Sequence, residues 1–117
     1  MNRCLLLSLI FLFFYKSDAQ TGVLKQIKVA GNNFVTSDNK VFIFRGLNTS
    51  DPDNLMKNEH WNKAYFQEIK NWGANVVRFP VHPTAWRRQG KDKYLKMLDE
   101  GVNWATELGI YVIMRFS

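Results

Sequence analysis

The sequence has 117 residues, a formal net charge of +6 and 46% hydrophobic residues. This length suits one small domain, and the composition is typical of a globular protein. It excludes a disordered tail, a collagen-like fibre and a disulfide-rich miniprotein.

Residues 1–19 have the layout of a secretory signal peptide. Arg3 gives a positive start, residues 5–14 are almost purely apolar, and Ser17 and Ala19 are small residues at the positions that a signal peptidase reads. The apolar run is too short to span a bilayer as a helix. We therefore predict cleavage after Ala19 and a secreted or periplasmic location. A short N-terminal membrane anchor is the alternative.

Cleavage would leave residues 20–117 as the mature domain. The only cysteine, Cys4, would leave with the signal, so we expect no disulfide and no thiol chemistry. Basic residues cluster in the segment 87–96, within a predicted loop and an amphipathic helix. This cluster favours a solvated face, and export also argues against nucleic acid as a partner. We expect no membrane contact after cleavage.

The mature chain begins with a predicted β-hairpin. Residues 27–29 and 33–35 are short strand-like segments on either side of a Gly-Asn pair, and residues 36–40 form a polar turn. The β-prone run VFIF then begins a strand that we expect over residues 41–47. Residues 48–58 follow as a polar loop.

Two helices and two strands are predicted next. Trp61, Tyr65, Ile69 and Trp72 recur at helical spacing, and Gly73 is a typical helix stop. Residues 75–79 are then a strand that ends at Pro80.

The same pattern follows a second time. A helical face is marked by Leu95, Leu98, Val102, Ala105 and Leu108. Gly109 is the second stop, and residues 111–114 form the next strand.

The helix–Gly–strand units at residues 72–77 and 108–113 align without gaps, which predicts a βαβαβ arrangement. Strands with little alternation favour a parallel sheet that is buried on both faces. A doubly wound sheet or a (β/α) barrel would fit. No glycine-rich phosphate loop follows the strand at 41–47, which argues against a dinucleotide-binding domain. Because residue 117 falls on the third sheet strand, we expect the N-terminal part of a larger fold.

Function in parallel α/β folds lies at the C-terminal ends of the strands. The polar and aromatic residues that the sequence places at these ends are Arg45, Asn48, Arg78, His82, Trp86 and Arg115. Residues 51–54 (DPDN) carry oxygen ligands but lack the glycine and the terminal glutamate of a calcium loop. We interpret them as a turn, and predict no metal site and no cofactor.

Three motifs resemble glycoside hydrolase family 5, the cellulase and mannanase family of clan A. Residues 44–48 (FRGLN) are similar to the end of its first strand, and residues 72–81 (WGANVVRFPV) to its second strand. Residues 108–114 (LGIYVIM) are similar to its third strand, and the opening hairpin resembles the ribbon at the barrel bottom. The third strand then departs from the family, because Arg115 and Phe116 stand where an acidic or aromatic residue and a histidine are common.

The resemblance implies a (β/α)8 TIM barrel that cleaves β-linked glucans or mannans with retention. Two glutamates would act as acid/base and nucleophile, with carboxyl groups about 5–5.5 Å apart. In the family they lie at the ends of the fourth and seventh strands, so we expect this chain to lack both catalytic residues. The glutamates present are Glu59, Glu68, Glu100 and Glu107. We interpret all four as solvated surface.

The resemblance also assigns site residues. Arg78 would support catalysis by hydrogen-bonding the nucleophilic carboxylate and lowering its pKa. Asn48, His82 and Trp86 would bind substrate, with Trp86 stacking on a sugar ring. The alternatives are an arginine that closes a helix or loop for Arg78, a loop cap for Asn48, a polar rim residue for His82 and an apolar loop anchor for Trp86.

The sequence thus predicts a secreted retaining glycosidase of the endo-β-glycanase type, with a polysaccharide or oligosaccharide as its partner, present as a fragment that is inactive alone. A catalytically inactive carbohydrate-binding or structural remnant of the same fold is the first alternative. An unrelated secreted α/β binding module is the second.

Overall fold

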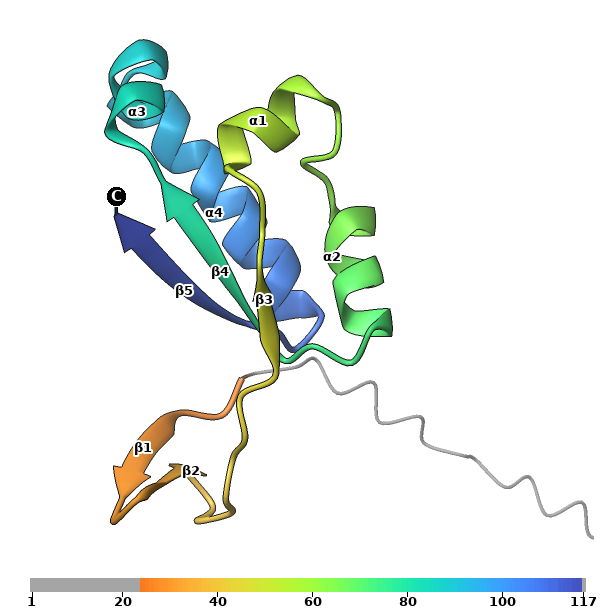
Figure 1. Cartoon of the computed structure of the whole chain (residues 1–117), viewed down its shortest axis with the longest axis vertical. Helices are drawn as coiled ribbons and strands as arrows, with labels where there is room; N and C mark the ends of the chain where they lie inside the picture. Colours follow the sequence, from red (N-terminus) through yellow and green to blue (C-terminus); the bar gives the residue numbers. More distant parts are fainter. Residues whose placement is uncertain (1–23, 117) are drawn as a thin grey trace, which may run out of the picture.

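The computed structural model describes residues 24–116, so the predicted signal peptide and Ser117 lie outside the described residues. Strands β1 (Ile27–Ala30) and β2 (Asn33–Thr36) form an antiparallel hairpin in which Val29 pairs with Phe34. This confirms the predicted hairpin. In Figure 1 the hairpin lies beyond the N-terminal ends of the other strands.

Three further strands form one parallel sheet in the order β3-β4-β5. They are β3 (Gly46–Asn48), β4 (Val76–Val81) and β5 (Tyr111–Phe116). Because all three run in the same direction, their C-terminal ends form one edge of the sheet (Figure 1).

Four helices connect the strands and confirm the predicted βαβαβ arrangement. Helices α1 (Pro52–Lys57) and α2 (Lys63–Asn71) lie between β3 and β4, and helices α3 (Pro83–Gln89) and α4 (Lys91–Glu107) lie between β4 and β5. No helix formed by residues 24–116 is long and apolar enough to cross a membrane.

The first sheet strand is shorter than predicted and begins only at Gly46. The β-prone run before it stays near the hairpin, where Val41 makes an isolated bridge to Val35 and Phe42 N–H donates to the Phe34 carbonyl. The expectation of a strand over residues 41–47 was therefore wrong for its first five residues. The backbone of Ile43 and Arg45 is bonded by the Asn75 side chain, which donates to the Ile43 carbonyl and accepts from Arg45 N–H, each at 2.8 Å.

Pro80 was expected to end the second sheet strand, but it lies inside β4 and pairs with Arg115. The reason is local geometry. The Arg78 carbonyl accepts from Thr49 N–H, so this residue directs its backbone polar groups toward β3. Pro80, two residues later, faces the same side at a point where β3 has already ended at Asn48. Its missing N–H therefore costs no ladder hydrogen bond.

Helix α2 confirms the first helical prediction, with corrections to its buried face. Asn62 caps the helix, and Gly73 has a φ of 87°, as its predicted role as a stop requires. Ile69 is buried as expected. Trp72, predicted on the same face, is instead 75% exposed at the C-cap, where its indole N–H donates to Glu68, and the fully buried Phe66 was missed.

Helix α4 confirms the second helical prediction. Leu98 and Ala105 are buried in the core, and the other three predicted positions are half-buried. Tyr94 and Met97 are also fully buried and were not predicted. Gly109 follows the helix with a φ of 74°.

Two short helices replace predicted loops. The polar loop at 48–58 contains α1, whose cap Asp51 accepts from Asp53 N–H at 2.9 Å, so the interpretation of residues 51–54 as a turn was wrong. The segment that carries Trp86 is helix α3 rather than a loop. Each helix has a proline in its first turn, where a missing N–H is tolerated.

The core lies between the sheet and the helices that cover one of its faces. Phe79 of β4 packs edge-to-face against Trp61 and Phe66, with ring centroids 5.4 and 5.8 Å apart. The Trp61 indole N–H donates to the Met97 carbonyl of α4 at 3.0 Å. The alternate residues of β4, Arg78 and Pro80, are half-buried on the opposite face, which no helix of the described chain covers.

Candidate functional site

Asn48 and Arg78 lie side by side at the C-terminal edge of the sheet. The register pairs Asn48 with Arg78 and Arg78 with Ile113. These three side chains, with Gly46, Leu47 and Val76, line a cavity of about 220 Å³. The structure therefore brings two of the predicted site residues together, on the face of β4 that points away from the core.

Thr49, directly after β3, fixes this pair and was not singled out from the sequence. Its backbone N–H donates to the Arg78 carbonyl at 3.0 Å, and its hydroxyl donates to the same oxygen at 3.3 Å. The side chain is almost completely buried. These two bonds hold the end of β3 against Arg78, so the positions of Asn48 and Arg78 are coupled through the backbone.

No acidic side chain lies on the sheet strands. Strands β3, β4 and β5 contain neither aspartate nor glutamate. Glu68 and Glu107 are exposed on helices, bonded to the Trp72 indole and to Lys63. Glu59 is exposed in the turn after α1, and Glu100 is half-buried on α4. Arg78 has no ion-pair partner within residues 24–116.

His82 lies between β4 and α3, close to the segment that leads from β3 into α1. Its Nε2 is 3.9 Å from a carboxylate oxygen of Asp51, the cap of α1. It precedes α3 but makes no side-chain cap hydrogen bond, and its side chain is 46% exposed. His82 is not among the residues that line the Asn48–Arg78 cavity.

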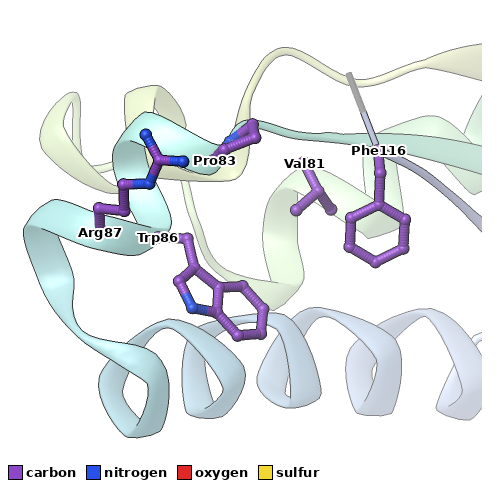
Figure 2. A pocket seen from close by; sticks show the side chains of 5 residues that line it. All are labelled: Val81, Pro83, Trp86, Arg87 and Phe116. Carbon is purple, nitrogen blue, oxygen red and sulfur yellow. The ribbon is translucent and has the colours of Figure 1, made fainter.

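Trp86 lines a different cavity. Figure 2 shows the Val81, Trp86 and Phe116 side chains directed to the same side of the strands, toward the helix below them. With Pro83 and Arg87 they line an open apolar pocket of about 290 Å³. The Trp86 ring also packs against Tyr94 of α4, with centroids 5.4 Å apart. The structure therefore does not bring Trp86 to Asn48 and Arg78.

Asp53 on α1 is a buried carboxylate that sequence reasoning missed. It accepts hydrogen bonds from Arg88 and Gln89 of α3, and its carboxylate is 2.9 Å from Lys57 Nζ. Burial raises the pKa of Asp53, but the hydrogen bonds from Lys57, Arg88 and Gln89 outweigh burial and hold the pKa at about 2. Lys57 lies four residues after Asp53, so the sequence predicts this ion pair within a helix. Arg88 and Gln89 lie 35 and 36 residues away, and no sequence spacing predicts these contacts.

A second buried polar group lies on α4 near this carboxylate. Tyr94 is completely buried, and burial is the main cause that raises the pKa of its hydroxyl, with smaller contributions from Asp51 and Asp53. Within residues 24–116, no group of three or more His, Cys, Asp or Glu side chains could hold a metal ion.

The profile of the family described as Cellulase (glycosyl hydrolase family 5) matches residues 27–116. The chain belongs to glycosyl hydrolase family 5. Its fold is therefore the beginning of a (β/α)8 barrel, in which β3, β4 and β5 are parallel barrel strands and the Arg78 face of the sheet is the interior.

Solved structures agree with the family 5 assignment. The β-glucanase SdGluc5_26A from Saccharophagus degradans is 45% identical, with a TM-score of 0.73, in its native form and in complex with cellotetraose. The cellulase Cel5C_n is 21% identical with a TM-score of 0.68, and the match covers 84% of this chain and 32% of the Cel5C_n chain. The alkaline cellulase K catalytic domain is 20% identical with a TM-score of 0.59, and the match covers 81% of this chain and 27% of the cellulase K domain.

The match to the β-glucanase covers 77% of this family 5 chain but only 27% of the β-glucanase chain. No curated protein sequence matches at a significant level. The sequence motifs at residues 44–48 and 72–81 thus identified the family correctly, and the described residues correspond to about a quarter of the β-glucanase.

Proposed function

We propose that this chain is the N-terminal part of a secreted, retaining hydrolase of β-linked glucans. The observation that carries the proposal is the 45% identity to a β-glucanase whose complex with cellotetraose is solved. This identity favours β-glucan over mannan as the substrate. An endo mode of cleavage and export through the predicted signal peptide at residues 1–19 are part of the same proposal.

Arg78 is proposed to act on a carboxylate that another part of the barrel supplies. Its guanidinium lies on the interior face at the C-terminal edge, next to Asn48, and no carboxylate lies on the described strands. A fixed guanidinium stabilises the charged form of a nearby glutamate and orients it for nucleophilic attack. Retaining hydrolysis needs two such carboxyl groups, so residues 20–117 alone are expected to be inactive.

The structure supports the three proposed substrate contacts to different degrees. They are Asn48, His82 and Trp86. Asn48 shares the Arg78 cavity, which supports a contact with the sugar close to the reacting bond. His82 is exposed at the rim beside Asp51. Trp86 packs on Tyr94 and lines the apolar pocket between the strands and α4, which supports its alternative role as an apolar anchor.

Hydrolysis by the complete protein that carries this chain tests the proposal. We expect mixed-linkage β-glucan and cellotetraose to be cleaved faster than β-mannan, and the first product released to keep the β configuration when it is followed by proton NMR. An α-configured first product, or faster cleavage of mannan, would contradict the proposal. Binding of cellotetraose without turnover would instead support the alternative of an inactive carbohydrate-binding protein.

A further inference from the structure

Asp53 joins the two segments that follow β3 and β4. The carboxylate belongs to α1, four residues after Thr49, and its partners Arg88 and Gln89 belong to the end of α3. One carboxylate oxygen faces Arg88 and Lys57, and the other faces Gln89. Both segments start at the C-terminal ends of the strands, which form the mouth of the barrel. This contact therefore connects two neighbouring parts of the mouth.

The carboxylate in this contact is buried, whereas its two basic partners are exposed to solvent. The Asp53 side chain is 9% exposed, whereas those of Arg88 and Lys57 are 51% and 56% exposed. A carboxylate that is removed from water needs compensating donors, and its removal leaves those donors without their partner. Asp53 is therefore the group on which the arrangement depends, while Arg88 and Lys57 retain access to solvent.

Each joined segment carries a proposed substrate contact. The β3 segment holds Asn48, and Thr49 fixes its end to the Arg78 carbonyl. The β4 segment begins with His82 and continues directly into α3, which Asp53 holds at Arg88 and Gln89. The short helix α3 thus has Asp53 as its polar attachment to α1 and Trp86 as its apolar attachment to α4.

We propose that Asp53 is a positioning residue that holds His82 at a fixed place relative to Asn48 and Arg78 in the substrate-binding mouth. This inference rests on the proposed function, because it assumes that a β-glucan chain binds at this edge. Asp53 itself is bonded to Arg88, Gln89 and Lys57, so it acts through the position of α3 rather than by contact with sugar. A contact that positions binding groups affects substrate and transition state alike, so its loss raises KM more than it lowers kcat.

The test compares Asp53→Asn with Asp38→Asn in the complete protein. Asp38 is the control because it also accepts from a lysine at 2.9 Å and has a pKa of about 2, but its side chain is 39% exposed and lies in the turn after the hairpin, away from the mouth. We expect Asp53→Asn to raise KM for cellotetraose about tenfold, as befits the loss of charged hydrogen bonds, with kcat changed less than about threefold. Asp38→Asn should change neither constant.

Hydrogen exchange of the same variants gives a readout that needs no activity. Asp53→Asn should accelerate exchange in residues 82–90 and leave the strand β4 protected, and Asp38→Asn should affect only the hairpin. An unchanged KM with faster exchange at 82–90 would overturn the positioning role, and so would unchanged exchange. If the wild-type protein neither cleaves nor binds cellotetraose, the proposed function fails, and the exchange of residues 82–90 alone decides whether Asp53 fixes the α3 segment.

Discussion

The indole of Trp61 lies directly against the backbone of Gly101. A Cβ at position 101 would be 2.2 Å from Trp61 Cζ2 and 3.3 Å from the Phe79 ring. Trp61 precedes α2 and Gly101 lies in the middle of α4, so this contact sets how closely the two helical segments approach above the sheet. The glycine is needed for space, since α4 continues through it as regular helix.

Gly101→Ala is expected to destabilise the protein. Alanine is the better helix former, so helix propensity alone predicts a gain in stability. The overlap with Trp61 outweighs this gain, because overpacking a core costs about 1–3 kcal/mol. Urea unfolding checks the sign, with Asn103→Ala at an exposed position of α4 as the control that should keep or raise stability. A stabilised Gly101→Ala would show that Trp61 moves away freely.

Acid should weaken the fold through two carboxylates. The pKa values of Asp38 and Asp53 are lowered from 3.8 to about 2 in the folded protein. Their stabilising contributions are therefore present above about pH 4 and are lost as the pH falls toward 2. The urea midpoint of the wild type should fall over this range, and the difference from Asp53→Asn should shrink with it. Asn103→Ala, which removes no titratable group from an exposed position of α4, should keep the wild-type profile.

Arg78→Ala in the complete protein should lower kcat about 100-fold with a smaller effect on KM, because a misplaced nucleophile costs about this much. Arg78→Lys should not restore full activity, since an ammonium lacks the planar fork of a guanidinium. Steady-state kinetics on cellotetraose measure both. Arg87→Ala is the control, because Arg87 is exposed on α3 and lines the Trp86 cavity rather than the Asn48–Arg78 cavity. Normal turnover in Arg78→Ala would refute the proposed role.

Asn75→Ala should loosen the start of β3. The Asn75 side chain takes the place of ladder hydrogen bonds to Ile43 and Arg45, and each lost bond costs about 1 kcal/mol. Amide exchange at Arg45 should accelerate, and the urea midpoint should fall. Asn71→Ala is the control, because among residues 24–116 the exposed Asn71 side chain bonds only to Gln67 of the same helix. If Arg45 exchanged at the wild-type rate, the side chain would not be what holds this segment.

Export should produce a new N-terminus close to Gln20. The charged start, the apolar run and the small residues Ser17 and Ala19 predict this cleavage. Mass spectrometry of protein secreted by an expressing cell measures the terminus. Ala19→Phe should block or shift processing, whereas Gln20→Asn, just beyond the predicted cleavage site, should not. Intact Met1 on membrane-bound wild-type protein would favour the N-terminal anchor instead.

Much of the fold could be predicted from the sequence, because periodicity reports burial. Helices α2 and α4 have the apolar spacing that a buried helical face requires, and the hairpin, β4 and β5 are β-prone runs between turn residues. Helices α1 and α3 were missed because six and seven residues give too few turns for a periodic pattern. Their signals were local and readable: a proline in the first turn of each, and Asp51 as the cap of α1.

The candidate site was less predictable, because its contacts join distant parts of the chain. Alternation along β4 placed Arg78 on the face opposite Phe79, and the parallel register brought it to Asn48. The bonds of Thr49 to Arg78 and of Asp53 to Arg88 span 29 and 35 residues. No spacing rule reports such pairs. The late start of β3 has the same origin, since Asn75 lies 32 residues from Ile43.

Pro80 has a consequence for how this molecule meets other chains. The stretch of β4 beyond the end of β3 presents a short open edge toward the barrel mouth. An edge with a free N–H invites another extended segment to add to the sheet. Because Pro80 has no N–H at that position, a lengthened β3 or a foreign strand would find one donor fewer there, although the Pro80 carbonyl could still accept. Strand addition at this point of the mouth is thereby weakened while the mouth stays open to solvent.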